Sequence, residues 1–247
     1  MIGLKNSVRS KVFMMDMDGV VLRHPTVFKI LGSRVQSFVR KNVNPYMSDK
    51  EVEKMNQVLY KDFGHTVLGL QRLYDSNISI NNFCEYVYDK PLMNYVEILN
   101  RDDIFNENAL EFRRFLETCK DKDIPVFIFS NANQLWCRSI LDTMEITSLP
   151  NSHIIGCDSQ AYQTTKEVCL KPNKVTYSKA VQYVYKTLAG PLEREFVYVD
   201  DQVQNLMPVL NNQYWKKVWF NTDKEKTEIY TPSMCTVRSI PQLYNLL

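Results

Sequence analysis

Two carboxylates stand two residues apart at the end of a short apolar run, where Asp16 and Asp18 are followed at once by Gly19. Carboxylates repel each other and cost free energy to remove from water, so a pair beside a buried segment needs a compensating positive group. Other polar residues that directly follow apolar runs are therefore candidates for the same site.

Three further groups of polar residues occupy comparable places. One apolar run ends in Ser130 and Asn131, and another ends in Asp200 and Asp201. Between them, Lys171 stands immediately before a segment that we expect to be helical. Ligands of an open parallel sheet bind beyond the carboxyl ends of its strands, so we expect these groups to share one site.

The chemistry of such a site is that of phosphate and a divalent metal. Several carboxylates in one pocket remain ionised only beside a cation, and oxygen ligands of this kind favour magnesium. Lys171 and the Ser130 hydroxyl can donate to the oxygens of a phosphoryl group. Backbone N–H groups around Gly19 and Asn131 are expected to add further donors.

The first two carboxylates can divide the work of phosphoryl transfer. Asp16 could attack phosphorus as a nucleophile. Asp18 could protonate the departing alkoxide and later deprotonate an attacking water. Taken singly, a DxD sequence, an Asp pair or a serine after a strand more often marks a turn or a helix cap. It is their combination that favours catalysis.

The hydrophobic pattern predicts the elements that would bring these groups together. Short apolar runs predict buried strands, and apolar residues at helical spacing predict helices between them. The expected strands are 12–15, 126–129, 153–156, 196–199 and 217–221, with a further one at 233–237. The expected helices are 106–119, 135–144 and 172–188, the last with Pro172 in its first turn. A charged loop is expected at 222–226.

The order of these elements favours an α/β fold. We expect a Rossmann-like, doubly wound, mostly parallel sheet with helices on both faces. From residue 25 to 100 the pattern is helical, and the segment Ser48 to Glu51 has the form of a capping box. The predicted organisation is an α/β core of residues 1–24 and 101–247, with a small all-helical cap, 25–100, inserted after the first strand.

Composition narrows the class of protein. The chain has 30 basic and 28 acidic residues and a net charge of +2, which gives no electrostatic case for nucleic acid or an anionic membrane. No apolar run approaches the length of a membrane span, and the N-terminal segment lacks the apolar region of a signal peptide. Six scattered cysteines without CxxC spacing favour reduced thiols. We therefore expect a cytoplasmic protein.

Four motifs occur in an order that resembles the haloacid dehalogenase (HAD) superfamily of phosphatases. Along the chain they read FMMDMDGVV, FIFSNAN, CLKPN and FVYVDD. The helical segment after the first motif falls where this superfamily places a small helical cap. The resemblance covers nearly the whole chain. It implies hydrolysis of phosphate esters through an aspartyl-phosphate, because a dehalogenase usually lacks the second carboxylate.

The resemblance implies a role for each core residue. Asp16 would be the nucleophile and Asp18 the general acid and base. Ser130 and Lys171 would hold the phosphoryl group. The segment EVCLKPN has one residue more near the lysine than the form we expect, which could displace Lys171.

The implied metal site lies in the same region. Magnesium would be bound by Asp16, the backbone carbonyl of Asp18 and Asp201, and Asp200 would support these ligands. Gln202 departs from the pattern, because a small hydroxyl residue usually follows the acidic pair.

A narrower likeness is to the pyrimidine 5′-nucleotidase-like branch of the superfamily. LYKDFGHTVLGL resembles its cap segment, and EYVYDKPL and DDQVQNL resemble two further stretches. On this likeness the substrate is a nucleoside monophosphate such as UMP or CMP, with aromatic side chains of the cap stacked on the base. The candidate substrate contacts in the cap are Tyr60, Lys61, Phe63, His65 and Thr66. Lys61 would meet phosphate or ribose.

Three functions remain open on these grounds. The first is a magnesium-dependent phosphatase acting on pyrimidine nucleotides. The second is a phosphatase acting on a phosphosugar or another small metabolite. The third is a non-catalytic regulatory protein that retains a phosphate- and metal-binding pocket. Each takes a small phosphate ester as its partner, and the sequence leaves the oligomeric state open.

Overall fold

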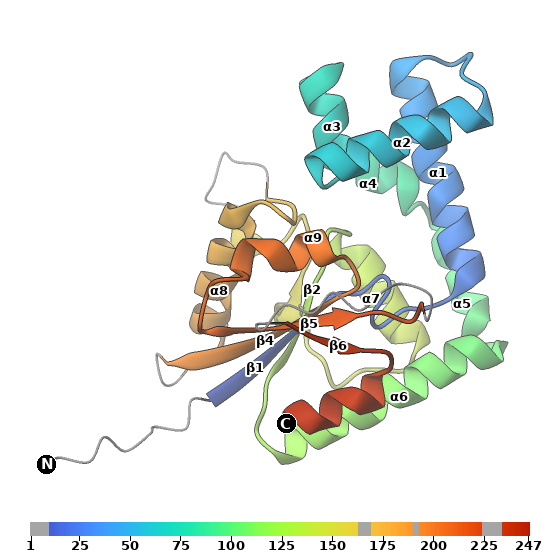
Figure 1. Cartoon of the computed structure of the whole chain (residues 1–247). Helices are drawn as coiled ribbons and strands as arrows, with labels where there is room; N and C mark the ends of the chain where they lie inside the picture. The colour runs from blue at the N-terminus through green and yellow to red at the C-terminus, as the bar shows by residue number, and fades with distance from the viewer. Residues whose placement is uncertain (1–9, 163–168, 190–192, 224–233) are drawn as a thin grey trace, which may run out of the picture.

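The computed structural model describes residues 10–162, 169–189, 193–223 and 234–247. Within these ranges six parallel strands form one sheet in the order β3-β2-β1-β4-β5-β6 (Figure 1). The strands are β1 Ser10–Met15, β2 Val126–Phe129, β3 Ile154–Ile155, β4 Arg194–Asp200, β5 Trp215–Phe220 and β6 Met234–Val237. The expected α/β, doubly wound, parallel architecture is confirmed.

Helices cover both faces of the sheet because successive side chains of a strand point to opposite faces. Phe13 and Met15 of β1 belong to one hydrophobic cluster, and Val12 and Met14 belong to the other. The first face is covered by α6 Asp103–Asp121, α7 Gln134–Thr143 and the 3₁₀ helix η5 Ile240–Leu246. The second is covered by α8 Lys174–Thr187 and α9 Val203–Leu206.

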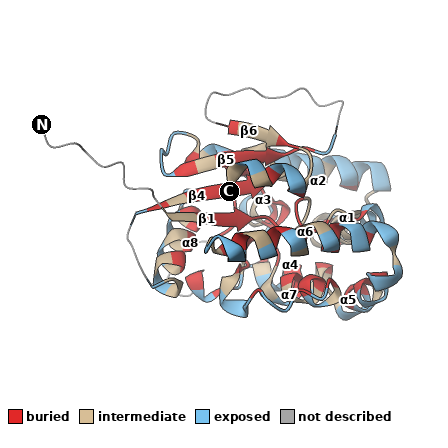
Figure 2. Ribbon diagram, turned by 90° about the horizontal axis from the view of Figure 1, so that it is seen from below, coloured by how far each residue is buried: buried red, intermediate tan, exposed pale blue. Residues whose placement is uncertain are grey.

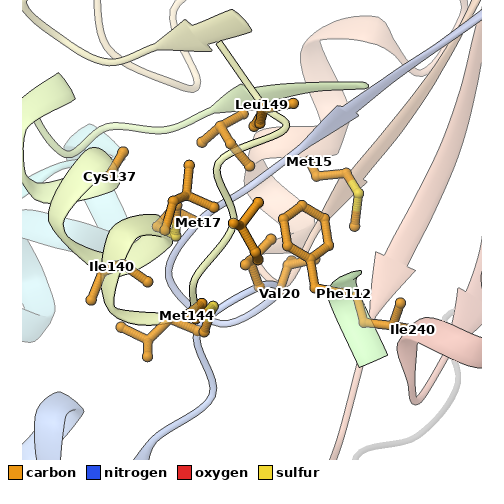
Figure 3. Packing of buried hydrophobic residues seen from close by; sticks show 14 of the residues in the cluster. Met15, Met17, Val20, Phe112, Cys137, Ile140, Met144, Leu149 and Ile240 are labelled. Atoms are coloured by element: carbon orange, nitrogen blue, oxygen red, sulfur yellow. The ribbon is translucent and has the colours of Figure 1, made fainter. Parts of the chain in front are cut away.

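The first cluster fixes the start of the loop that carries the two carboxylates. Figure 3 shows Met17 and Val20, from the loop after β1, among side chains of α6, α7 and η5. Both are fully buried, as is Phe112 of α6. Each such side chain contributes about 1.5–3 kcal/mol to folding when removed from water. Asp16 and Asp18 flank Met17 in the sequence, so both carboxylates are held on a loop with an apolar anchor.

Every described element between residues 25 and 101 is helical. These elements are α1 Pro25–Val43, α2 Asp49–Phe63, α3 Thr66–Leu73, α4 Ile80–Val87, α5 Lys90–Glu97 and the 3₁₀ helix η1 Ile98–Arg101. The predicted capping box opens α2, where the Glu51 N–H donates to the Ser48 hydroxyl and the Ser48 N–H donates to the Glu51 carboxylate. Helices α1 to α4 enclose a third hydrophobic cluster of their own.

The expected helix 172–188 begins later than the sequence pattern indicates. Helix α8 starts at Lys174, and the Asn173 side chain accepts a hydrogen bond from the Val175 N–H at 3.0 Å. Pro172 therefore precedes the helix and does not lie in its first turn, because the asparagine cap defines the helix start.

Burial follows the layers of the fold. The strands are largely buried, whereas the outward sides of the covering helices are exposed (Figure 2). No helix in the described part of the chain is both long and apolar enough to cross a bilayer. Most of the expected loop at 222–226 lies outside the described residues.

Candidate active site

Three strand ends meet at one edge of the sheet. Asp16 follows β1, Ser130 follows β2, and Asp201 follows Asp200, the last residue of β4. Strand β1 lies between β2 and β4 and is parallel to both, so the three carboxyl ends are neighbours. The loop before α8 brings Lys171 to the same place.

Lys171 is the positive centre of this edge. Its side chain is 1% exposed, and its Nζ lies 3.0 Å from Asp16 Oδ1 and 2.8 Å from Asp200 Oδ2. The ammonium also donates to the Phe129 carbonyl oxygen at 2.8 Å. Burial disfavours the charge, but the two carboxylates outweigh it and hold the pKa of Lys171 above its ordinary value. The additional residue in EVCLKPN therefore does not displace the ammonium from the site.

Asn131 fixes the backbone that carries this lysine. Its Oδ1 accepts from the Lys171 N–H at 2.7 Å, and its Nδ2 donates to the Lys171 carbonyl at 3.0 Å. The neighbouring Ser130 is buried, and its Oγ accepts from the Ala132 N–H at 3.1 Å. Both Ser130 and Asn131 line the same cavity as Lys171, where the sequence predicted them.

Asp200 is surrounded by donors from the protein itself. Its Oδ2 accepts from Lys171 and from the Tyr198 hydroxyl at 2.6 Å. Its Oδ1 accepts from the Gln202 N–H at 2.9 Å and from Asn205 Nδ2 at 3.0 Å. With both oxygens engaged, this carboxylate orients the lysine and the loop after β4.

Asp16, Asp200 and Asp201 form an acidic cluster that could hold a metal ion. One carboxylate oxygen from each lies within 4.8 Å of the other two. Burial, with repulsion from neighbouring carboxylates, raises the pKa of Asp16 well above its ordinary value despite Lys171. Burial and then Asp200 raise the pKa of Asp201 to about 7. A hard divalent cation with oxygen ligands would relieve this repulsion, so the residues present fit such an ion.

Asp18 faces the same cavity but is not part of that cluster. The indole Nε1 of Trp136 donates to its carboxylate, 3.1 Å from Oδ1 and 3.3 Å from Oδ2. Burial raises the pKa of Asp18 to about 6, and the Trp136 hydrogen bond and Lys171 oppose the increase. A carboxyl group in this range can both give and take a proton near neutral pH.

Gly19 makes room for the acidic cluster. Its φ is +93°, and a Cβ at this position would lie 2.4 Å from Asp201 Cγ. Its own N–H donates to the Leu22 carbonyl at 2.9 Å and is already engaged. The donation of N–H groups around Gly19 to a phosphate therefore stays a prediction, and what the glycine itself supplies is space.

The carboxyl edge of the sheet and the helical segment enclose a cavity of about 330 Å³. Three of the five cap residues predicted from the sequence line it: Tyr60, His65 and Thr66. Lys61 is exposed, Phe63 is half-buried, and neither lines the cavity. Lys61 is turned by about 100° from Tyr60 around α2 and so points away from the cavity. Phe63, the last residue of α2, lies nearer the side of Tyr60, but it packs against the hydrophobic cluster of α1 to α4.

Sequence reasoning missed several residues of the cavity wall. They are Phe28, Gly32, Val35, Asn56, Phe83 and Tyr88. The first three lie at i, i+4 and i+7 on α1, and Asn56 precedes Tyr60 by one turn of α2. Shared helix faces were therefore the signal that could have found them. The Asn56 carboxamide accepts from the Thr66 hydroxyl at 2.6 Å.

His65 is a neutral wall residue. It is 8% exposed, and its Nδ1 accepts from the Val67 N–H at 3.2 Å. Burial lowers the pKa of His65 to about 4. Its imidazole is therefore uncharged near neutral pH and is no cationic phosphate ligand.

A larger cavity, of about 600 Å³, lies elsewhere in the molecule. It is lined by Ile124, Pro125 and Val126 at the amino end of β2, together with residues of α6. It contains none of the acidic cluster, so the chemistry described above belongs to the smaller cavity.

Comparisons with known proteins bear on the fold. No family model and no curated protein matches the chain. Among solved structures, a HAD hydrolase of family IA, variant 3, from Entamoeba histolytica matches at 12% identity and TM-score 0.54, with 94% of each chain covered. A haloacid dehalogenase-like hydrolase from Burkholderia xenovorans matches at 14% and 0.50, covering 95% of this chain and 97% of its own.

A third solved structure is similar over the same extent. It is a phosphoserine phosphohydrolase-like protein from Francisella tularensis, at 16% identity and TM-score 0.50, with 96% of this chain and 99% of that chain covered. The three neighbours match nearly end to end, including the helical segment. This chain has the α/β fold of the haloacid dehalogenase-like hydrolases.

Proposed function

We propose that this chain is a magnesium-dependent phosphomonoesterase that works through an aspartyl-phosphate on Asp16. One observation carries the proposal: Asp16 lies against the buried ammonium of Lys171, and a second carboxyl group, Asp18, faces the same cavity. A nucleophile, a fixed positive charge and a proton carrier are the groups that hydrolysis of a phosphate ester needs.

In the first half-reaction, a carboxylate oxygen of Asp16 forms a bond to phosphorus, and the bond from phosphorus to the ester oxygen breaks. Asp18 gives its proton to that oxygen, so the alcohol leaves uncharged. Its raised pKa keeps an appreciable fraction of Asp18 protonated near neutral pH. Lys171 and Ser130 would bind the oxygens of the phosphoryl group as negative charge redistributes.

In the second half-reaction, a water molecule attacks the phosphorus of the aspartyl-phosphate. Asp18, now a carboxylate, takes a proton from this water. The bond between phosphorus and Asp16 breaks, inorganic phosphate leaves, and both aspartates return to their starting states.

Asp16, Asp201 and the backbone carbonyl of Asp18 would hold the magnesium ion. When bound, the ion would neutralise charge on the phosphate and on the facing carboxylates. Asp200 would support them, since both of its oxygens already accept hydrogen bonds from the protein.

Residues 25–100 act in this proposal as a cap that selects the substrate. Among the described residues, the cap side chains that line the cavity are uncharged at neutral pH and include the aromatic rings of Phe28, Tyr60, Phe83 and Tyr88. Flat apolar faces favour a nucleobase over the hydroxyl-rich surface of a sugar. The favoured substrates are therefore pyrimidine nucleoside 5′-monophosphates, with a phosphosugar as the alternative.

We also propose that the protein works in the cytoplasm. All six cysteines are free thiols, and a reducing compartment would keep them so.

The test is phosphate release by the purified full chain from a panel of nucleoside monophosphates and sugar phosphates, with magnesium and with a chelator. We expect UMP and CMP to have the highest kcat/KM and the chelator to abolish turnover. Asp16→Asn should lower turnover by more than about a thousandfold. No release from any substrate would refute the proposal, and equal rates with a sugar phosphate would favour the alternative.

A further inference from the structure

A tryptophan holds the carboxyl group to which the proposed function gives the proton transfer. Trp136 lies in the first turn of α7, and its side chain is fully buried. Its single N–H reaches both oxygens of Asp18, at 3.1 and 3.3 Å. The contact joins residues 118 positions apart, so it exists only because the fold brings the loop after β1 beside α7.

The indole N–H of Trp136 affects the Asp18 proton differently from a hydroxyl partner. An indole N–H only donates, so it can bind an oxygen of the carboxyl group but can never accept that group's proton. When Asp18 is protonated, its proton therefore remains available to the leaving group. A hydroxyl partner could accept the proton in a hydrogen bond of its own and compete with the substrate.

Neighbouring residues hold both the backbone and the ring of Trp136. The Asn133 side chain accepts from the Trp136 N–H of the backbone at 2.9 Å and caps α7 at this turn. The ring of Tyr88 stacks on the indole with centroids 5.1 Å apart and an interplanar angle of 30°. Tyr88 follows α4 and also lines the cavity, so the cap contributes to the position of the indole.

We infer that Trp136, stacked under Tyr88 of the cap, is a positioning residue that aims the Asp18 carboxyl group at the leaving-group oxygen. The inference rests on the proposed phosphatase function. It assigns to Trp136 a role in the step that breaks the ester bond. For substrates whose leaving group needs no proton, loss of this contact should leave kcat/KM nearly unchanged.

Two substrates distinguish a role of Trp136 in positioning Asp18 from a general role in the stability of the fold. The first is the best nucleoside monophosphate, whose ribose alkoxide leaves poorly without a proton. The second is 2,4-dinitrophenyl phosphate, whose phenolate leaves readily as an anion. We compare kcat/KM, because this quantity reports the steps up to departure of the leaving group and excludes hydrolysis of the shared aspartyl-phosphate.

Trp136→Phe keeps an aromatic ring against Tyr88 and removes the N–H. We expect kcat/KM to fall by about 10- to 100-fold with the nucleotide and to change by less than about twofold with dinitrophenyl phosphate. Replacement of Trp136 by 3-benzothienylalanine, which has sulfur in place of the indole N–H and nearly the same shape, should give the same split. This second variant preserves the packing if the phenylalanine variant folds poorly.

Trp215→Phe is the matched control. Trp215 is a buried tryptophan on β5 that stacks on Phe196 in the other hydrophobic cluster, far in sequence from the loop after β1. This variant should affect both substrates equally, if at all. Equal losses on the two substrates in the Trp136 variants, or no loss on either, would overturn the inference and leave the phosphatase function standing. A wild-type chain that hydrolyses neither substrate would overturn the proposed function itself.

Discussion

At the scale of single residues, the site is a balance of buried charge around Lys171. A fully buried ammonium is costly alone, and here two carboxylates and one backbone carbonyl surround it. The same contacts hold Asp16 at the wall of the cavity, where the proposed function requires a nucleophile. The same contacts of Lys171 therefore serve both the stability of the fold and the proposed chemistry.

We predict that Lys171→Met lowers the free energy of unfolding by about 3–5 kcal/mol at neutral pH without metal, because it leaves buried carboxylates unpaired. Urea denaturation followed by circular dichroism measures the change. Lys217→Met is a matched control, since Lys217 is also buried but its Nζ donates to the Trp215 carbonyl and, among the described residues, meets no carboxylate.

Burial lowers the pKa of Lys217, so removing its charge should cost little or stabilise the protein. Equal destabilisation by the two variants would show that the ion pairs with Asp16 and Asp200 are not what makes Lys171 important.

At the scale of elements, the turn between α2 and α3 connects the cap to the lysine loop. Gly64 ends α2 with φ +77°, and a Cβ there would lie 2.2 Å from Pro172 Cδ. The next residue, His65, is the N-cap of α3 and packs edge-on against Phe83. The start of α3 is thus built around a histidine that must stay neutral.

We predict that His65 makes the stability of the protein depend on pH. Its pKa is about 4 when folded and about 6.5 when unfolded. Its contribution is complete above about pH 6.5 and is lost as the pH falls towards 4, because only the unfolded chain then binds the proton. Asn can cap the helix without titrating, so His65→Asn should abolish this part of the pH dependence.

The measurement is the free energy of unfolding of wild type and His65→Asn at several pH values. Between about pH 7 and pH 4, the free energy of unfolding of the wild type should fall by up to about 3 kcal/mol more than that of His65→Asn. A difference that is constant with pH would contradict the buried neutral histidine.

At the scale of the whole molecule, the cap and the core both contribute residues to the wall of the cavity. Leu170, which directly precedes Lys171, belongs to the hydrophobic cluster of the cap. Cys84 of α4 and Cys157, which follows β3, place their Sγ atoms 3.4 Å apart across the same boundary. A disulfide between these two cysteines would therefore test whether the cap lies against the core in this way.

We predict that the dithiol oxidant diamide joins Cys84 to Cys157, with both thiol hydrogens passing to the diamide. The contact with Cys84, and then burial, raise the pKa of Cys157, so the reaction should be faster at alkaline pH. Peptide mapping without reduction identifies the linked pair. On the proposed function, the linked protein should hydrolyse its phosphate ester more slowly, because a link between cap and core would hinder exchange of substrate and product.

Cys84→Ser supplies the control, since it should resist both the crosslink and the loss of activity. A link between other cysteines in the wild type would show that the cap does not sit on the core as described.

The residues at the strand ends could be predicted from the sequence because their position follows from local pattern. An apolar run followed by polar residues marks a strand end, and parallel strands bring such ends together. The cap residues could not be assigned in the same way. Lys61 directly follows Tyr60 in the sequence, yet only Tyr60 lines the cavity, because packing against α1 and α3 sets the rotation of α2. Phe63 continues the helix face of Asn56 and Tyr60, but it packs against the hydrophobic cluster of α1 to α4.

The sequence by itself determined the parallel α/β sheet, the helical segment after the first strand and the set of polar residues at the strand ends. Each depends on hydrophobic periodicity and short motifs, which are properties of neighbouring residues. Only the tertiary structure decided that Trp136 meets Asp18, that Gly19 leaves room for Asp201, and which side of α2 forms the cavity wall. These are contacts between segments far apart in the chain, and they depend on packing that no local pattern specifies.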